Sequence, residues 1–191
     1  MPEQQRDENP SAPMVKRLGR QIRWDAAAAI IASLVGLLAL VVAGYTAYIQ
    51  RQQVRAQVWP YLLGGFSGGN KELIWINKGV GPAIIRNVEV SIDGKPQANW
   101  TAVFQTLHIA PPKFFQSTLN DNVISAGEKV DWLQFRDKAD YDQFKLIEPR
   151  LHVKVCYCST LGDCWIADSA VSGRTAVGTC PRVPASRQFN D

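Results

Sequence analysis

The residues with the clearest chemical potential are four cysteines near the end of the chain. Cys156, Cys158 and Cys164 lie within nine residues, in the stretch VCYCSTLGDCW, and Cys180 follows sixteen residues later. Thiolates bind soft metal ions, paired thiols cycle with disulfides, and stable disulfides brace small extracytoplasmic domains. The elements around the cysteines, and the compartment they occupy, decide between these three chemistries.

The residues before the cysteine loop alternate as in a β-strand. One face carries apolar side chains that we expect to be buried: Leu151, Val153, Val155 and Tyr157. The other face carries polar and sulfur-containing side chains: His152, Lys154, Cys156 and Cys158. If residues 159–163 form the loop of a hairpin, Cys158 lies opposite Cys164, and the same register places Tyr157 opposite Trp165.

In this register the Cβ atoms of Cys158 and Cys164 are about 5 Å apart, which is slightly more than the usual separation in a disulfide. A small relaxation brings the two sulfurs within bonding distance, so the register favours this disulfide. Cys156 then pairs with Cys180. That bridge would anchor a C-terminal tail poor in large apolar residues, and it contributes about 3 kcal/mol by chain entropy. The alternative set, Cys156–Cys164 with Cys158–Cys180, stays open, and a Cys156–Cys158 bridge is the least favoured.

A metal or thiol-redox site is the alternative use of these residues. His152, Cys156, Cys158 and Cys164 could converge on one face as ligands for zinc or copper(I). However, zinc motifs usually place two residues between paired cysteines, whereas one residue separates Cys156 from Cys158. No Cys-x-x-Cys motif opens a helix. We therefore expect structural disulfides, with no metal and no other cofactor.

The chain shows no recognisable catalytic motif. It has only two histidines, His108 and His152, and no G-x-S-x-G elbow. The glycine-rich stretch GGFSGGN, residues 64–70, lacks the Lys-Ser/Thr pair of a phosphate-binding loop, and we expect a hairpin loop there. The formal net charge of +4 is spread along the sequence, which argues against nucleic-acid binding. The prediction is a protein that is not an enzyme, with no catalytic residue to name.

The strongest pattern in the chain is the apolar run AAAAIIASLVGLLALVVAGYTAYI, residues 26–49. It contains no charge, Asn, Gln or Pro. A helix of this length measures about 36 Å, against a hydrocarbon core of about 30 Å, so the run predicts a transmembrane helix in a lipid bilayer. A cleaved signal peptide ending near residues 42–44 is the alternative. The apolar run and the leader before it are both longer than usual for such a peptide, and we favour an uncleaved anchor.

Basic residues predict the orientation of this helix. Four of them precede the apolar run closely: Lys16, Arg17, Arg20 and Arg23. Only Arg51 and Arg55 follow the run closely. By the positive-inside rule, the N-terminus lies in the cytoplasm and the remainder of the chain in the periplasm of a bacterium, anchored in the inner membrane. This compartment is oxidising, which fits an even number of cysteines beyond the membrane.

Small residues recur at every fourth position in the apolar run. Ala32 and Gly36 belong to one such stripe. This spacing lets two helix backbones approach closely, so a homodimer through Ala32 and Gly36 is one expectation. Frequent alanine in any bacterial anchor is the alternative explanation.

Short β-branched and apolar runs beyond Pro60 predict an antiparallel β-sandwich. The run at 83–94 alternates clearly and closes at the turn Asp93-Gly94. Other candidate strands have the same character and lie at 71–79, 114–118, 123–124, 129–135 and 151–167. Two short segments, 99–107 and 139–146, look helical or turn-like.

Two stretches, NKGVGPAIIRNVEVSIDGK (77–95) and ISAGEKVDW (124–132), resemble the immunoglobulin-like domains of bacterial envelope proteins. They are similar in particular to cell-adhesion-related modules, in which a strand ending in Asn-x-Gly leads to a strand of alternating valines and then to a small-Gly-Glu turn. The resemblance covers about 55 residues. It implies an immunoglobulin-like fold and an extracytoplasmic setting, and it implies no activity.

The sequence thus predicts a mainly β protein with a single N-terminal membrane helix. Its expected parts are a disordered cytoplasmic tail (1–25), a transmembrane helix (26–49), a helical stalk (50–58), an immunoglobulin-like β-sandwich (59–170) and a tail tethered by Cys180 (171–191). Since catalytic residues are not recognisable and folds of this kind often serve binding, we expect a non-enzymatic module that binds an envelope protein or has a structural role.

Overall fold

The structure is a computed structural model that describes residues 15–171 and 173–191. The chain forms two compact units, the first reaching to Gln52 and the second running from Gln53 to Asp191. The described part of the first unit is helical, and the second contains the strands.

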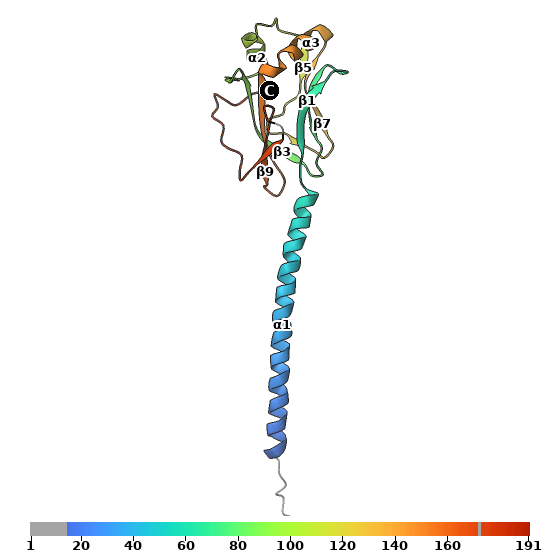
Figure 1. Cartoon of the computed structure of the whole chain (residues 1–191), viewed down its shortest axis with the longest axis vertical. Helices are drawn as coiled ribbons and strands as arrows, with labels where there is room; N and C mark the ends of the chain where they lie inside the picture. The colour runs from blue at the N-terminus through green and yellow to red at the C-terminus, as the bar shows by residue number, and fades with distance from the viewer. Residues whose placement is uncertain (1–14, 172) are drawn as a thin grey trace, which may run out of the picture. The chain divides into compact units, whose positions relative to one another are not determined.

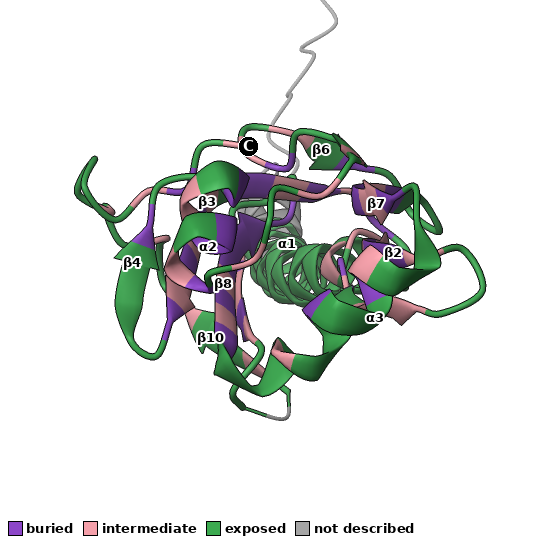
Figure 2. Cartoon of the chain, turned by 90° about the horizontal axis from the view of Figure 1, so that it is seen from above, coloured by how far each residue is buried: buried purple, intermediate pink, exposed green. Residues whose placement is uncertain are grey.

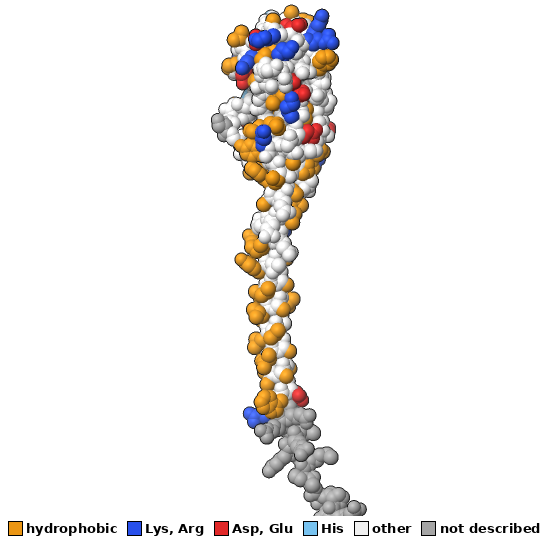
Figure 3. Space-filling view, turned by 90° about the vertical axis from the view of Figure 1, so that its right-hand side faces the viewer, with side chains coloured by type: hydrophobic (Ala, Val, Ile, Leu, Met, Phe, Trp, Pro, Cys, Tyr) orange, Lys and Arg blue, Asp and Glu red, His pale blue; other side chains and the backbone are white. Residues whose placement is uncertain are grey.

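The helix α1 (Val15–Gln57) is continuous and includes both the predicted apolar run and the predicted stalk (Figure 1). Its large apolar side chains from Trp24 to Val54 are exposed, and hydrophobic side chains follow the helix along most of the face shown in Figure 3. By length and composition, Arg23–Gln57 is a candidate membrane span. The helix ends just before Trp59-Pro60, where proline disfavours helical geometry at the preceding residue.

The helix begins earlier than predicted. The expectation of a disordered segment over 1–25 is wrong for residues 15–25, which are helical, and residues 1–14 lie outside the described residues. Most of this segment consists of residues with good helix propensity, such as Leu, Arg and Gln. Once a helix has nucleated, each added residue gains a hydrogen bond, so the apolar helix extends into its polar flank.

The second unit contains two antiparallel sheets. The first has the strand order β1-β2-β7-β5. The bounds of its strands are β1 (Leu62–Ser67), β2 (Glu72–Asn77), β5 (Phe114–Gln116) and β7 (Lys129–Phe135). The predicted loop at 64–70 is wrong in its first half, because Gly64 to Ser67 belong to β1 and the turn begins only at Gly68.

The second sheet has the order β10-β9-β8-β3-β4, and β6 pairs with β3. Its strands are β3 (Ala83–Ile92), β4 (Lys95–Gln97), β6 (Val123–Ile124), β8 (Leu151–Cys158), β9 (Cys164–Asp168) and β10 (Arg174–Val177). The predicted turn at Asp93-Gly94 is present, with both residues at positive φ. Tyr157 lies opposite Trp165, as the register predicted, with ring centroids 5.9 Å apart.

Both sheets contribute to one hydrophobic core (Figure 2). The predicted apolar face of β8 is buried. A cluster of aromatic side chains from the strands and helices extends the core. Trp100 and Trp132 are at its centre, with ring centroids 4.7 Å apart. The two predicted helical segments are α2 (Trp100–Thr106) and α3 (Lys138–Leu146), and a short 3₁₀ turn, η1 (Glu148–Arg150), precedes β8. The side chain of Asn99 caps α2 by accepting from the amide of Ala102 over 2.9 Å.

The start of β1 is fixed by a buried asparagine. Asn77, fully buried, accepts hydrogen bonds from the amides of Tyr61 and Gly79, at 3.0 and 2.9 Å. Its amide group donates to the carbonyls of Gly81 and Ile124, at 2.8 and 3.0 Å. A Cβ on Gly79 or Gly81 would lie within 2.6 Å of the backbone of residues 58–61, so these glycines permit a close backbone contact.

The C-terminal segment is more than a tail tethered by Cys180. Residues 174–177 form β10, which pairs with β9, and Phe189 is fully buried in the core. The amide of Phe189 donates to the carbonyl of Val88 over 3.0 Å, and the Asp191 carboxylate accepts from the amide of Leu119 over 2.7 Å. The prediction missed this because Phe189 is a single large apolar residue in an otherwise polar stretch.

Candidate functional site

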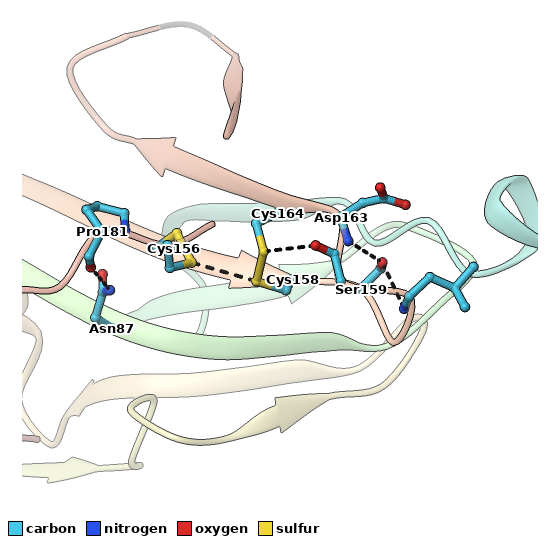
Figure 4. The surroundings of a disulfide bond; sticks show 10 residues. Asn87, Cys156, Cys158, Ser159, Asp163, Cys164 and Pro181 are labelled. Atoms are coloured by element: carbon cyan, nitrogen blue, oxygen red, sulfur yellow. Dashed lines mark hydrogen bonds between the residues drawn. A yellow bond between two sulfur atoms is a disulfide. The ribbon is translucent and has the colours of Figure 1, made fainter. Parts of the chain in front are cut away.

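One disulfide joins β8 to β9, and the other joins β8 to the segment after β10; Figure 4 shows Cys156, Cys158 and Cys164 close together. Cys158 is bonded to Cys164 and Cys156 to Cys180, with Cα atoms 4.0 and 5.8 Å apart. The Sγ atoms of Cys158 and Cys180 are 3.8 Å apart, so the two bridges are in contact. These are the pairs that the strand register favoured, and the alternative set is not the one in the structure.

The loop between β8 and β9 holds this register in place. The amide of Ser159 donates to the carbonyl of Asp163 over 2.8 Å, which closes the loop directly beyond the Cys158–Cys164 pair. The Ser159 hydroxyl oxygen also accepts from the amide of Asp163 over 3.3 Å. Gly162 has a φ of 83°, a conformation that glycine adopts without steric cost. The loop contacts therefore support the register that places Cys158 opposite Cys164.

The sulfur cluster differs from the predicted ligand set. The metal-ligand atoms that lie within 4.8 Å of one another belong to Cys158, Cys164 and Cys180. Within the described residues, neither Cys156 nor His152 is part of this group. All of these sulfurs are in disulfides, and metal binding requires thiolate. The cluster can thus offer soft ligands only after reduction.

His152 contacts Asp168 instead of the sulfurs. Its Nε2 pairs with one carboxylate oxygen of Asp168, and the Lys154 ammonium lies 3.3 Å from the other. Burial alone raises the pKa of Asp168. The hydrogen bonds from the Ala170 amide and from His152 outweigh burial and hold that pKa below its usual value. At neutral pH, Asp168 is therefore an ionised carboxylate paired with neighbouring basic groups.

A serine next to this pair does not complete a nucleophilic site. The Ser169 hydroxyl oxygen accepts from the amide of Val153 over 2.9 Å, and its own amide donates to the Val153 carbonyl over 2.9 Å. Among the described residues, no hydrogen bond joins the Ser169 hydroxyl to His152. Ser169, His152 and Asp168 therefore lack the nucleophile–base contact that acyl-transfer catalysis needs. The geometry fits a surface polar network.

A largely apolar cleft of about 300 Å³ lies between the edge of the first sheet and β8–β10 of the second. Its apolar lining comes from both sheets and includes Leu63, Phe66, Leu151, Val153, Ala167 and Val171. Clefts of this size and lining bind apolar groups of ligands or partner chains. This cleft is the feature of the unit best suited to binding.

The cleft wall contains a buried donor with no acceptor. Trp75, 4% exposed, lines the cleft, and its indole Nε1 has no hydrogen-bond partner among the described residues. The ring edge that includes Cε2, the atom bonded to Nε1, packs against Gly64, where an added Cβ would be 3.2 Å away. An unsatisfied buried N–H group is costly, so a ligand that brings an acceptor gains affinity here.

A charged side chain also lines the cleft. The Arg174 guanidinium stacks on the ring of Tyr61, and both residues line the cleft. Its Nε is buried and has no hydrogen-bond partner within the described residues. Together with Trp75, Arg174 gives the cleft two donors that lack acceptors. Neither donor belongs to the cysteine cluster, which was the candidate site predicted from the sequence.

The cleft was missed because the residues 64–70 were interpreted as a loop. A signal for it existed in the sequence. Gly64 and Gly65 stand between the apolar residues Leu62–Leu63 and Phe66, and glycine inside a strand often marks close approach by a ligand or another backbone. Residues of the far wall such as Ala167, Val171 and Arg174 come from a distant part of the chain that no local pattern connects to β1.

No known protein family, curated protein or solved structure gives a significant match to the chain.

Proposed function

We propose that the chain is a single-pass inner-membrane protein of a bacterium whose C-terminal unit binds a partner in the periplasm and is not an enzyme. The observation that carries the proposal is the combination of a long apolar helix with a β-structured unit in which all four cysteines form disulfides. Disulfides persist in oxidising compartments, and the helix provides a membrane anchor.

The membrane anchor is supported by the exposure of the helix. Side chains such as Leu34, Leu38 and Val41 are about 60% exposed, and the apolar positions cover every face of residues 26–49. A helix apolar on all sides needs an apolar environment, which a bilayer supplies. The excess of Lys and Arg before the span favours a cytoplasmic N-terminus.

An immunoglobulin-like sandwich is the proposed architecture of the C-terminal unit. Two antiparallel sheets share one core in it, and the residues of the resemblance form β3, β6 and β7 with their turns. Sandwiches of this kind commonly present binding surfaces at their edges and loops. The apolar cleft supports a binding role for this one.

A topology reporter tests the proposal. Alkaline phosphatase, which is active only outside the cytoplasm, is fused after Asp191 through a flexible linker, and the same fusion is made with Lys16, Arg17, Arg20 and Arg23 replaced by Gln. We expect activity in the first fusion and a marked loss in the second, because the charge difference sets the orientation. An inactive first fusion with full-length protein in the membrane contradicts the proposal.

A periplasmic metal or thiol-redox module is the second candidate. The three sulfurs within 4.8 Å favour it, since partial reduction would place thiolates beside one another. Intact-mass spectrometry without reductant separates the candidates. Two disulfides and no bound zinc or copper in protein isolated from membranes support the structural role, whereas thiols carrying metal support the second candidate.

Pairing of two anchors through Ala32 and Gly36 stays a prediction. Crosslinking of full-length protein in membranes, compared between the wild type and Gly36→Leu, measures it. A dimer band that the substitution removes would support the packing of small residues.

A further inference from the structure

β1 is an edge strand, and part of its backbone has no partner. Among the described strands, it pairs with β2 alone. The Leu62 amide donates to the Tyr157 hydroxyl over 3.5 Å, so it points away from β2. Because hydrogen-bond direction alternates along an antiparallel strand, the N–H and C=O groups of Gly64 and Phe66 also point away from β2. Within the described residues, no hydrogen bond from another element reaches these two backbones.

Two glycines leave this edge open to another chain. Gly64 and Gly65 have no positive φ, so the backbone conformation does not demand glycine. A Cβ on Gly64 would lie 3.0 Å from the Trp75 ring, whereas one on Gly65 would meet nothing within 4 Å. Glycine weakens a strand interior, and it is retained where a ligand or a backbone must approach. The packed Trp75 ring accounts for Gly64, and access to the edge accounts for Gly65.

The cleft lies beside this open edge. Leu63, Gly64, Gly65 and Phe66 all line it. Side chains of β1 alternate between faces, and Leu62, Gly64 and Phe66 face the same way as the buried Leu73 and Trp75 of β2. The Trp75 ring packs over Gly64, where a Cβ would be 3.0 Å away, so an inward side chain of a neighbouring strand meets this ring at the cleft.

The unpaired groups define the chemistry of the occupant. The edge offers N–H donors and C=O acceptors in alternation, and the Trp75 indole and Arg174 add two donors. An acyl chain has no groups to pair with these. An extended polypeptide supplies donors, acceptors and apolar side chains at the required spacing.

Resting on the proposed binding role, we infer that the edge of β1 from Leu62 to Phe66 accepts an extended segment of a partner protein. The segment adds a strand to the first sheet and places one apolar side chain in the cleft over Trp75. Its backbone pairs with Gly64 and Phe66. This is β-strand addition, in which main-chain hydrogen bonds give affinity and the pocket gives side-chain selectivity.

Amide hydrogen exchange tests the inference with a control inside the same strand. Full-length protein labelled with ¹⁵N-Gly and ¹⁵N-Trp is placed in nanodiscs of phosphatidylethanolamine and phosphatidylglycerol. The probe is the peptide acetyl-Val-Thr-Leu-Thr-Val-amide. Gly64 has an outward amide, whereas the Gly65 amide is directed to β2. We expect the peptide to slow exchange at Gly64 about tenfold or more, to leave Gly65 unchanged and to shift the Trp75 indole resonance.

Two comparisons separate strand addition from simple filling of the cleft. A peptide of the same sequence, N-methylated at alternate residues on its pairing edge, keeps the side chains and loses the hydrogen bonds, and we expect it to give no protection. The substitution Ala167→Leu fills the cleft and should abolish protection. Ala170→Leu, at an exposed position outside the cleft, should have no effect.

Several results would overturn the inference. Slow exchange at Gly64 in the free protein means that the edge is already covered, and if that protection rises with protein concentration, the occupant is a second copy of the chain. Unchanged exchange at Gly64 with saturating peptide, or equal protection by the N-methylated peptide, excludes strand addition. The alkaline phosphatase fusion and the intact mass are independent of exchange, so a failure of the proposed function is recognised separately.

Discussion

The two ends of the C-terminal unit are fastened in different ways. Where the chain enters, β1 is held by hydrogen bonds around Asn77 and by its pairing with β2, and no described residue hydrogen-bonds to its outer edge at Gly64 and Phe66. Where the chain leaves, a disulfide at Cys180 and the buried Phe189 fix the segment to the core. The comparison teaches that covalent and apolar anchors secure the end of the fold, while the entry strand keeps a backbone edge available.

Among the substitutions that test this comparison, Phe189→Ala should lower the free energy of unfolding most. The ring is fully buried, with centroids 5.1 Å from Trp100 and 5.6 Å from Trp132. Its loss leaves a cavity, and we expect the free energy of unfolding to fall by about 4 kcal/mol. Chemical denaturation followed by tryptophan fluorescence measures this. Leu161→Ala, at a 46% exposed loop position, is the matched control and should change little.

Removal of the Cys156–Cys180 bridge by serine at both positions should come next. The two cysteines are separated by 24 positions in the sequence. The chain-entropy model therefore predicts that the free energy of unfolding falls by about 3 to 4 kcal/mol. The Cys158–Cys164 bridge spans only six, so the corresponding double substitution should cost about 2 kcal/mol. Denaturation of both variants without reductant checks the order. A larger loss for the shorter loop would show that local packing, not loop length, dominates.

Asn77→Ala tests the entry end. The substitution leaves the amides of Tyr61 and Gly79 and the carbonyls of Gly81 and Ile124 without their partner, and we expect a loss of about 3 kcal/mol. Exchange of amides in β1 should accelerate more than exchange in β8. Asn70→Ala, at an exposed turn, is the control. Equal acceleration in both strands would mean that the two ends are not fastened independently.

The smallest expected effect concerns pH. The pKa of Asp168 is lower in the folded chain than its unfolded value of about 3.9, so its contribution is present above that value and is lost as pH falls through the folded pKa. Asp168→Asn should lower stability at neutral pH by about 1 kcal/mol and flatten the loss of stability below about pH 4. Thermal melts from pH 2 to 7 follow both effects. Asp142→Asn, in an exposed ion pair with Lys138, should leave the profile almost unchanged.

Local patterns predicted most elements of the fold. Alternation of apolar residues located β3, β7 and β8, and the loop after Cys158 gave the register that brings Cys158 opposite Cys164. Two features escaped. Phe189 is one apolar residue among polar ones, and its burial depends on contacts with Trp100 and Trp132, which are far away in sequence.

The cleft escaped for a related reason. Glycine at 64 and 65 is equally compatible with a turn and with a strand, and only pairing with β2 decides between them. Its second wall comes from β8, β9 and β10 of the other sheet. Sequence patterns describe single elements well, whereas a cleft between two sheets depends on how they pack.

The position of Phe189 also sets the order of events during synthesis. Phe189 follows every described strand in the sequence, and its ring packs against Trp100 and Trp132. This part of the core therefore closes only after all of those strands have been made. Until then, the indole surfaces that Phe189 covers stay exposed.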